Sequence, residues 1–205
     1  MFDAKAEIGL TLPSPDGPKK IVVHYPSDEQ FIDWRRKKKV VQKDLGRRSF
    51  QIESSKPEPG DLALLNAIRV DKEDGPAIDE AEAYYIMGQL SECEVSTRPE
   101  REGSSYTIQM KIMRKLNVSH TLRIPSVKDM MDYERMRSSV VFGQYGHQEI
   151  KINFRASADL YDKLKVATGG YKGDVPVPHK AEAINVLLQE IRAEQEEEQG
   201  DDEQD

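Results

Sequence analysis

The densest group of chemically active side chains in the sequence is a basic run that follows Trp34. Eight cations fall within fourteen positions, and Asp44 is the one acid among them. Cations at this density can neutralise several carboxylates or phosphates, and such contacts weaken as salt rises. We therefore predict a partner-binding site made of Arg35, Arg36, Lys37, Lys38, Lys39, Lys43, Arg47 and Arg48. A solvated helix face that binds nothing is the alternative.

The neighbours of this run favour a protein partner over a nucleic acid. Proteins that bind single strands place aromatic rings between their cations, so that bases can stack on them. Here Trp34 is the one aromatic residue beside the basic positions. A nucleic-acid-associated accessory protein, which would bind phosphates through a basic helix over residues 35–48, stays open as the second interpretation.

The remaining candidates for chemistry are weaker. The histidines, His24, His120, His147 and His179, lie far apart and show no metal-binding spacing. Cys93 has no second cysteine to pair with. The sequence therefore predicts no metal site and no thiol nucleophile.

Two loops resemble ligand-binding motifs without matching them. The segment that begins at Asp71 has glycine at its fifth position, whereas a calcium loop needs it at the sixth. The glycine-rich segment 168–173 lacks the residues of a phosphate-binding loop. We expect no catalysis, no cofactor and no metal, and hence not an enzyme.

The charge and cysteine content of the sequence indicate where its acidity lies and which cellular compartment suits it. The net charge is −7 over 205 residues, but eight acids lie between Glu194 and Asp205 with no base among them. The 37 acids less these eight leave 29 against 30 bases, so the acidity belongs to the tail. The single cysteine suits a reducing compartment. The first residues lack a signal-peptide pattern and no apolar run has membrane length, which predicts a cytoplasmic protein with no membrane contact.

An internal repeat organises the elements that must position these residues. Pro26 and Ser27 recur as Pro125 and Ser126, and 81–83 recurs as 181–183, both times as Ala-Glu-Ala. Further matches keep the same order along the chain. We therefore predict an α+β fold with a tandem duplication, consisting of a first repeat lobe (1–95), a linker (96–105), a second repeat lobe (106–193) and a disordered acidic tail (194–205).

Each repeat is expected to be a ββαβαα unit, and the two units are expected to form pseudo-symmetric lobes. Alternating runs around the turn residues 13–17 predict a hairpin, and 106–113 with 119–124 predict its second copy. Ser27 and Ser126 then begin a helix. One strand, a short helix and a longer helix complete each unit. In the first copy the strand is 49–53, and Val40 and Val41 are assigned to the helix before it.

The two copies of the strand–proline–helix junction read IVVHYPSDEQFIDW and TLRIPSVKDMMDY. This pattern resembles small α+β proteins of phage and prophage tail modules, such as tail assembly chaperones. The resemblance implies a non-catalytic protein that binds other virion components during assembly, in the host cytoplasm or on the virion. We therefore expect a protein-binding or assembly protein whose partners are other proteins.

Overall fold

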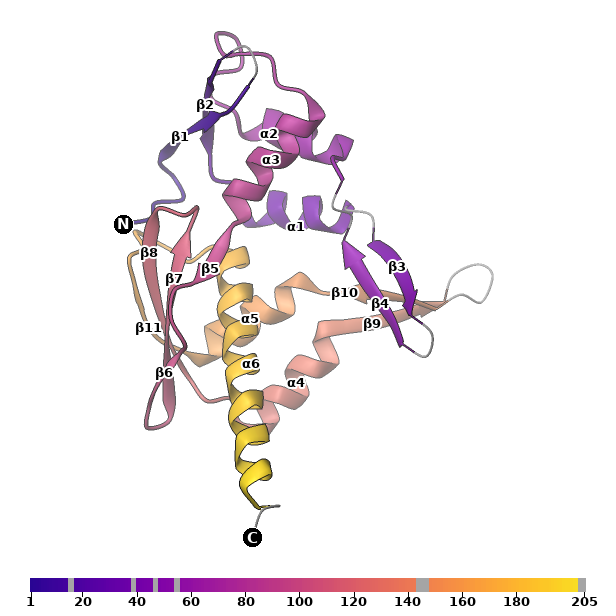
Figure 1. Ribbon diagram of the computed structural model, residues 1–205, viewed down its shortest axis with the longest axis vertical. Helices are drawn as coiled ribbons and strands as arrows, with labels where there is room; N and C mark the ends of the chain where they lie inside the picture. The colour runs from indigo at the N-terminus through magenta and orange to yellow at the C-terminus, as the bar shows by residue number, and fades with distance from the viewer. Residues whose placement is uncertain (15–16, 38–39, 46–47, 54–55, 143–147, 203–205) are drawn as a thin grey trace. The chain divides into compact units, whose positions relative to one another are not determined.

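The chain has a mixed α+β fold in the computed structural model (Figure 1), which describes residues 1–14, 17–37, 40–45, 48–53, 56–142 and 148–202. It divides into two compact units. One is Asp3–Glu92, and the other combines Met1–Phe2 with Cys93–Asp205. Within the described residues, no helix is both long enough and apolar enough to cross a lipid bilayer.

The unit Asp3–Glu92 consists of two hairpins and three helices. Its elements are β1 (Glu7–Leu12), β2 (Lys19–His24), α1 (Asp28–Lys37), β3 (Val40–Leu45), β4 (Arg48–Glu53), α2 (Pro59–Ile68) and α3 (Glu80–Ser91). The pairs β1–β2 and β3–β4 are antiparallel. Alternate residues of β1 and β2 face the core, which they share with buried side chains of the helices. These core residues include Leu12, Ile21, Val23, Leu65, Ile86 and Leu90.

Helix α1 begins where the sequence predicts it. The Ser27 hydroxyl accepts from the backbone N–H of Gln30 at 3.2 Å, and the Gln30 side-chain oxygen accepts from the backbone N–H of Ser27 at 2.9 Å. This capping box satisfies two N–H groups that a helix start would otherwise leave without partners. Arg35, Arg36 and Lys37 fill the last turn, where cations interact favourably with the helix dipole.

The predicted basic helix over 35–48 is wrong in its extent. Helix α1 ends at Lys37, and Val40 and Val41 begin strand β3. The pairing of Leu45 with Arg48 makes β3 and β4 a hairpin, where we expected a helix end and a single strand. β-Branched valines favour strands because their stiff side chains pack well on a pleated surface. The unit is therefore ββαββαα and not ββαβαα.

The second unit is built on a five-stranded antiparallel sheet. Its order is β11 (Lys165–Gly169), β8 (Leu116–Arg123), β7 (Ser105–Ile112) and β5 (Cys93–Val95), and β6 (Glu100–Glu102) also pairs with β7. The other elements are α4 (Val127–Arg137), β9 (Ser138–Phe142), β10 (Gln148–Ile152), α5 (Phe154–Leu164) and α6 (Val177–Asp202). The strands β9 and β10 form a separate hairpin.

The core of this unit lies between the sheet and two helices. Alternate residues of β7 are buried, and α5 and α6 contribute a second buried layer. The largest contributions come from Tyr106, Ile108, Met110, Ile112, Leu160, Tyr161, Ile184 and Leu187. Each such side chain contributes roughly 1.5–3 kcal/mol by leaving water.

Two segments of this unit differ from expectation. Residues 96–105, expected as a linker, contribute β6 to the sheet, and the unit begins at Cys93. The disordered acidic tail is not confirmed, because α6 continues as a helix to Asp202. Its side chains Glu190 and Glu194 bond to Arg98 and Arg101, which gives this part of the helix partners within its own unit.

Candidate partner-binding site

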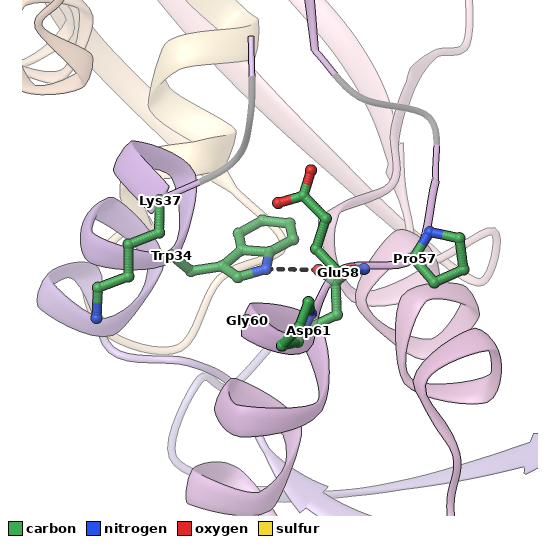
Figure 2. Close-up of a pocket in the computed structure, with 7 residues that line it drawn as sticks. Trp34, Lys37, Pro57, Glu58, Gly60 and Asp61 are labelled. Carbon is green, nitrogen blue, oxygen red and sulfur yellow. Dashed lines mark hydrogen bonds between the residues drawn. The ribbon is translucent and has the colours of Figure 1, made fainter.

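A pocket of about 370 Å³ opens in the unit Asp3–Glu92 between α1 and the start of α2 (Figure 2). Trp34 and Lys37 line it from α1, and residues 57–61, with the sequence Pro-Glu-Pro-Gly-Asp, line it from the N-terminal end of α2. This volume lies near the lower end of the range for small-ligand pockets. An indole and two proline rings give it apolar walls, and its charged lining residues are Lys37, Glu58 and Asp61.

The indole of Trp34 is fixed in place by Asp61. Its Nε1–H donates to Oδ1 of Asp61 at 2.7 Å, and both side chains are buried. Oδ2 of the same carboxylate accepts from the backbone N–H of Glu58 at 3.1 Å. Asp61 therefore caps α2 and orients the tryptophan at once, and its charge lies in the first turn, where the helix dipole favours an acid.

Cations lie beside this pocket at the end of α1. The Arg35 guanidinium is 6.0 Å from the ring centroids of both Phe31 and Trp34, a cation–π distance. Arg36 is exposed, and its Nη1 lies 3.8 Å from an Oδ1 of Asp33. Lys37 is also exposed and lines the pocket. An apolar recess with a positively charged edge can receive an apolar side chain that has acidic neighbours.

The structure places the predicted basic residues on three elements. Arg35, Arg36 and Lys37 are on α1, Lys43 is on β3 and Arg48 is on β4, where the backbone alone is described. Lys38, Lys39 and Arg47 lie outside the described residues. The prediction that these eight residues bind a partner stays a prediction. Sequence reasoning missed Pro57, Glu58 and Pro59, although a proline at a helix start is a recognisable signal.

The histidines occupy different environments. His24 is exposed on β2, and His147 lies outside the described residues. His120 on β8 and His179 on α6 are both fully buried, and the hydroxyl of Tyr171 is within hydrogen-bonding distance of each imidazole. Burial lowers the pKa of His120 to about 4 and that of His179 to about 3, and charge repulsion from His120 adds to the second shift. Both are therefore neutral at pH 7.

Other groups considered for chemistry have structural partners. Asp71, which begins the loop compared with a calcium site, accepts from the Nε–H of Arg69 at 2.9 Å. Burial, with repulsion from Glu182, raises the pKa of the Cys93 thiol to about 12, so very little thiolate exists at neutral pH. Across the described residues, no three His, Cys, Asp or Glu side chains come together in a way that could hold a metal ion.

Comparisons with known proteins give no relative to reason from: the chain matches no protein-family model, and neither curated proteins nor solved structures match it significantly.

Proposed function

We propose that this chain is a non-catalytic protein-binding protein that acts in assembly, and that the pocket between α1 and α2 is where it holds a partner. The observation that carries the proposal is the bond between Trp34 and Asp61, which presents a rigid indole at an open recess. Trp34 is itself buried, so it contributes a rigid apolar wall, and the exposed side chains of Arg36 and Lys37 contribute area that a partner can cover.

The charges around the pocket select an acidic partner segment. Arg36 and Lys37 are exposed beside the recess, and the basic run continues beyond them in the sequence. An acidic segment is drawn to such cations and associates faster at low salt. An apolar residue of that segment would fill the recess against Trp34, and its acidic neighbours would contact Lys37 and Arg36.

The order of elements supports an origin of the two units by duplication. A hairpin, a helix, a second hairpin and two further helices follow one another in Asp3–Glu92. The same order recurs from β7 to α6, with β11 added between α5 and α6. The helix starts correspond too, since Ser126 accepts from the backbone N–H of Asp129 as Ser27 does from that of Gln30. We propose that one ancestral unit gave both.

The resemblance of the two strand–proline–helix junctions to phage and prophage tail-module proteins makes the proposal more specific. On that basis the chain serves tail assembly, in the cytoplasm of the host or on the virion, and its partners are virion proteins. Catalysis forms no part of the proposed role. No step of it requires a cofactor.

Photo-crosslinking from the pocket edge tests the proposal. A photoreactive amino acid replaces Lys56, which is exposed next to the pocket residue Pro57, and the full chain is crosslinked in native host extract with and without nuclease. We expect protein crosslinks that survive nuclease. Charge reversals Arg36→Glu and Lys37→Glu should reduce them at least about tenfold, since each removes a favourable contact and adds a repulsive one.

Lys20→Glu is the matched control, because Lys20 is an exposed lysine of the same unit on β2. It makes the same change in net charge and should leave the crosslinks unchanged. Equal loss in all three variants would show that net charge alone drives binding, and the pocket would then be the wrong site. Crosslinks to nucleic acid that disappear with nuclease would favour the accessory protein that binds phosphates.

A further inference from the structure

Phe2 is held by the second unit through both its backbone and its ring. Its N–H donates to the carbonyl of Gly170 at 2.6 Å, and its carbonyl accepts from the N–H of Lys172 at 2.8 Å. These bonds pair it in parallel with Tyr171. The ring is 1% exposed and lies edge-on to Tyr171, with centroids 5.9 Å apart, and to His179, at 5.1 Å. The start of the chain is therefore a packed part of this unit.

Four side chains next to Phe2 form one line of hydrogen bonds. The Tyr161 hydroxyl is 2.7 Å from Nδ1 of His120, whose Nε2 is 3.1 Å from the Tyr171 hydroxyl. That hydroxyl is in turn 3.4 Å from Nδ1 of His179. One assignment of protons satisfies every bond: Tyr161 donates to neutral His120, His120 donates to Tyr171, and Tyr171 donates to His179. The line needs both histidines neutral.

The groups that face these imidazoles favour the neutral form. Tyr161 on α5 and Tyr171 after β11 contribute hydroxyls, and burial raises the pKa of Tyr161. Lys180 on α6 carries a nearby charge, since its Nζ lies 5.9 Å from the centre of the Tyr161 ring, and it bonds to Asp162 at 2.8 Å. Burial disfavours a proton on His120, and a proton on His179 is disfavoured by burial and by repulsion from a charged His120.

We propose that Phe2 and Tyr171 form an acid-released latch, which holds the start of the chain on this unit while His120 and His179 are neutral and lets it go when they take up protons. A protonated His120 donates from both nitrogens, so the Tyr161 hydroxyl must turn away from Nδ1. A buried charge without a compensating partner is costly. Opening of the Phe2 pairing relieves that cost with little loss of structure, because it breaks two backbone hydrogen bonds and two ring contacts and leaves the sheet of this unit paired.

The release changes how the other unit is tethered. The residues Asp3–Glu92 are joined to this unit through Phe2 at one end and through Cys93 at the other. Opening of the latch removes the hold of this unit on the residues before Asp3. The histidines of the open form titrate near pH 6.5, and those of the closed form near 4 and 3. The closed latch is therefore most stable above about pH 6.5 and loses stability as the pH falls from there towards 4.

Fluorine NMR of the full chain tests the latch. The phenylalanines are replaced by 4-fluorophenylalanine, and the Phe2 signal is assigned with Phe2→Leu. In a second sample, carbon-13-labelled methyl groups of Ile108, which is buried on β7, report by methyl NMR whether the unit itself stays folded. We expect the Phe2 signal to reach its free-chain position at a pH at least about 0.5 units above the pH at which the Ile108 signals change. Coincident changes would overturn the proposal.

Two kinds of variant link the release to the histidines. In the double variant His120→Gln and His179→Gln, the Phe2 signal should change only at the pH at which the Ile108 signals change. The control is His24→Gln, at an exposed histidine on β2, which should leave the release pH unchanged. Tyr171→Phe keeps the ring against Phe2 and removes the shared hydroxyl, so it weakens the closed form and should raise the release pH by roughly 0.5–1 unit. An unchanged release pH in Tyr171→Phe overturns the latch even if the glutamine variant does not fold.

Discussion

The indole nitrogen of Trp34 and the carboxylate of Asp61 meet at 2.7 Å, and this contact joins α1 to the first turn of α2. Because Asp61 belongs to the cap of α2, the position of the Trp34 side chain in the pocket depends on that cap. The rigidity of the proposed binding site therefore depends on a buried acid that does not itself have to contact the partner.

Removal of that acid should destabilise the unit Asp3–Glu92. Asp61→Ala leaves the indole N–H and the Glu58 N–H without this acceptor, so we expect a loss of about 2–4 kcal/mol in the free energy of unfolding. Trp34 is the only tryptophan, and its fluorescence in urea reports this unit directly. Asp74→Ala, at an exposed loop position, should cost less than about 0.5 kcal/mol. Similar losses in the two variants would contradict the capping role.

Gly170 should tolerate no side chain. Its φ of +82° is one that residues with a Cβ adopt at a cost, and an added Cβ would lie 2.6 Å from the carbonyl oxygen of Asn117. Strain and collision together predict that Gly170→Ala loses about 2–4 kcal/mol. Gly173→Ala separates the two causes, since its φ is +94° but nothing lies within 4 Å of the added atom. It should cost about 1–2 kcal/mol in urea unfolding followed by circular dichroism.

The acidic end of α6 should be held by charge. Glu194 accepts from Arg101 at 2.7 Å and from the Tyr106 hydroxyl, and Glu190 accepts from Arg98 at 2.5 Å. Both arginines are about half exposed, so Arg101→Ala should change global stability by less than about 1 kcal/mol. It should nevertheless speed hydrogen exchange of the amides around Glu194.

Added salt and a second arginine variant serve as controls for the hydrogen-exchange experiment on Arg101→Ala. About 1 M salt screens exposed ion pairs and should reproduce the faster exchange in the unmodified chain. Arg192→Ala removes an exposed arginine from α6 itself, and it should leave the exchange rates near Glu194 close to those of the parent. Exchange that responds to neither salt nor Arg101→Ala would show that packing, and not charge, holds this part of the helix.

Cys93 should react slowly with alkylating reagents. Burial raises the pKa of its thiol to about 12, so the thiolate that attacks iodoacetamide is scarce at pH 8. We expect alkylation of the folded chain to be at least about 100-fold slower than in urea, where the thiol regains its ordinary pKa. Mass spectrometry of quenched samples measures both rates. Equal rates would show an accessible thiol with an ordinary pKa.

The local parts of the fold could be predicted from the sequence because their causes are local. Ser27 with Gln30, and Ser126 with Asp129, fix helix starts through side chains three residues apart. The hairpin β1–β2 followed from alternating residues around a turn. The pair Val40–Val41 was misassigned because the preceding cations extended an apparently helical pattern, and the strand preference of valine prevailed over it.

The features that carry the two proposals could not be predicted in this way. Trp34 and Asp61 come from different helices, and their bond depends on how α1 packs on α2. His120 and His179 were separated in the sequence and share Tyr171 only because β8, α6 and the end of β11 meet in one core. Spacing along the chain holds no information on such meetings, since tertiary packing decides them.

The pairing of Phe2 with Gly170 and Lys172 has a consequence for synthesis on the ribosome. At about 5–20 residues per second, the partners of Phe2 are made roughly 10–30 s after Phe2 itself. The residues Asp3–Glu92 emerge complete in the meantime and can fold while the second unit is still being translated. Phe2 can therefore dock only after Gly170 and Lys172 have been translated, so its pairing forms later than the local contacts of the residues between them.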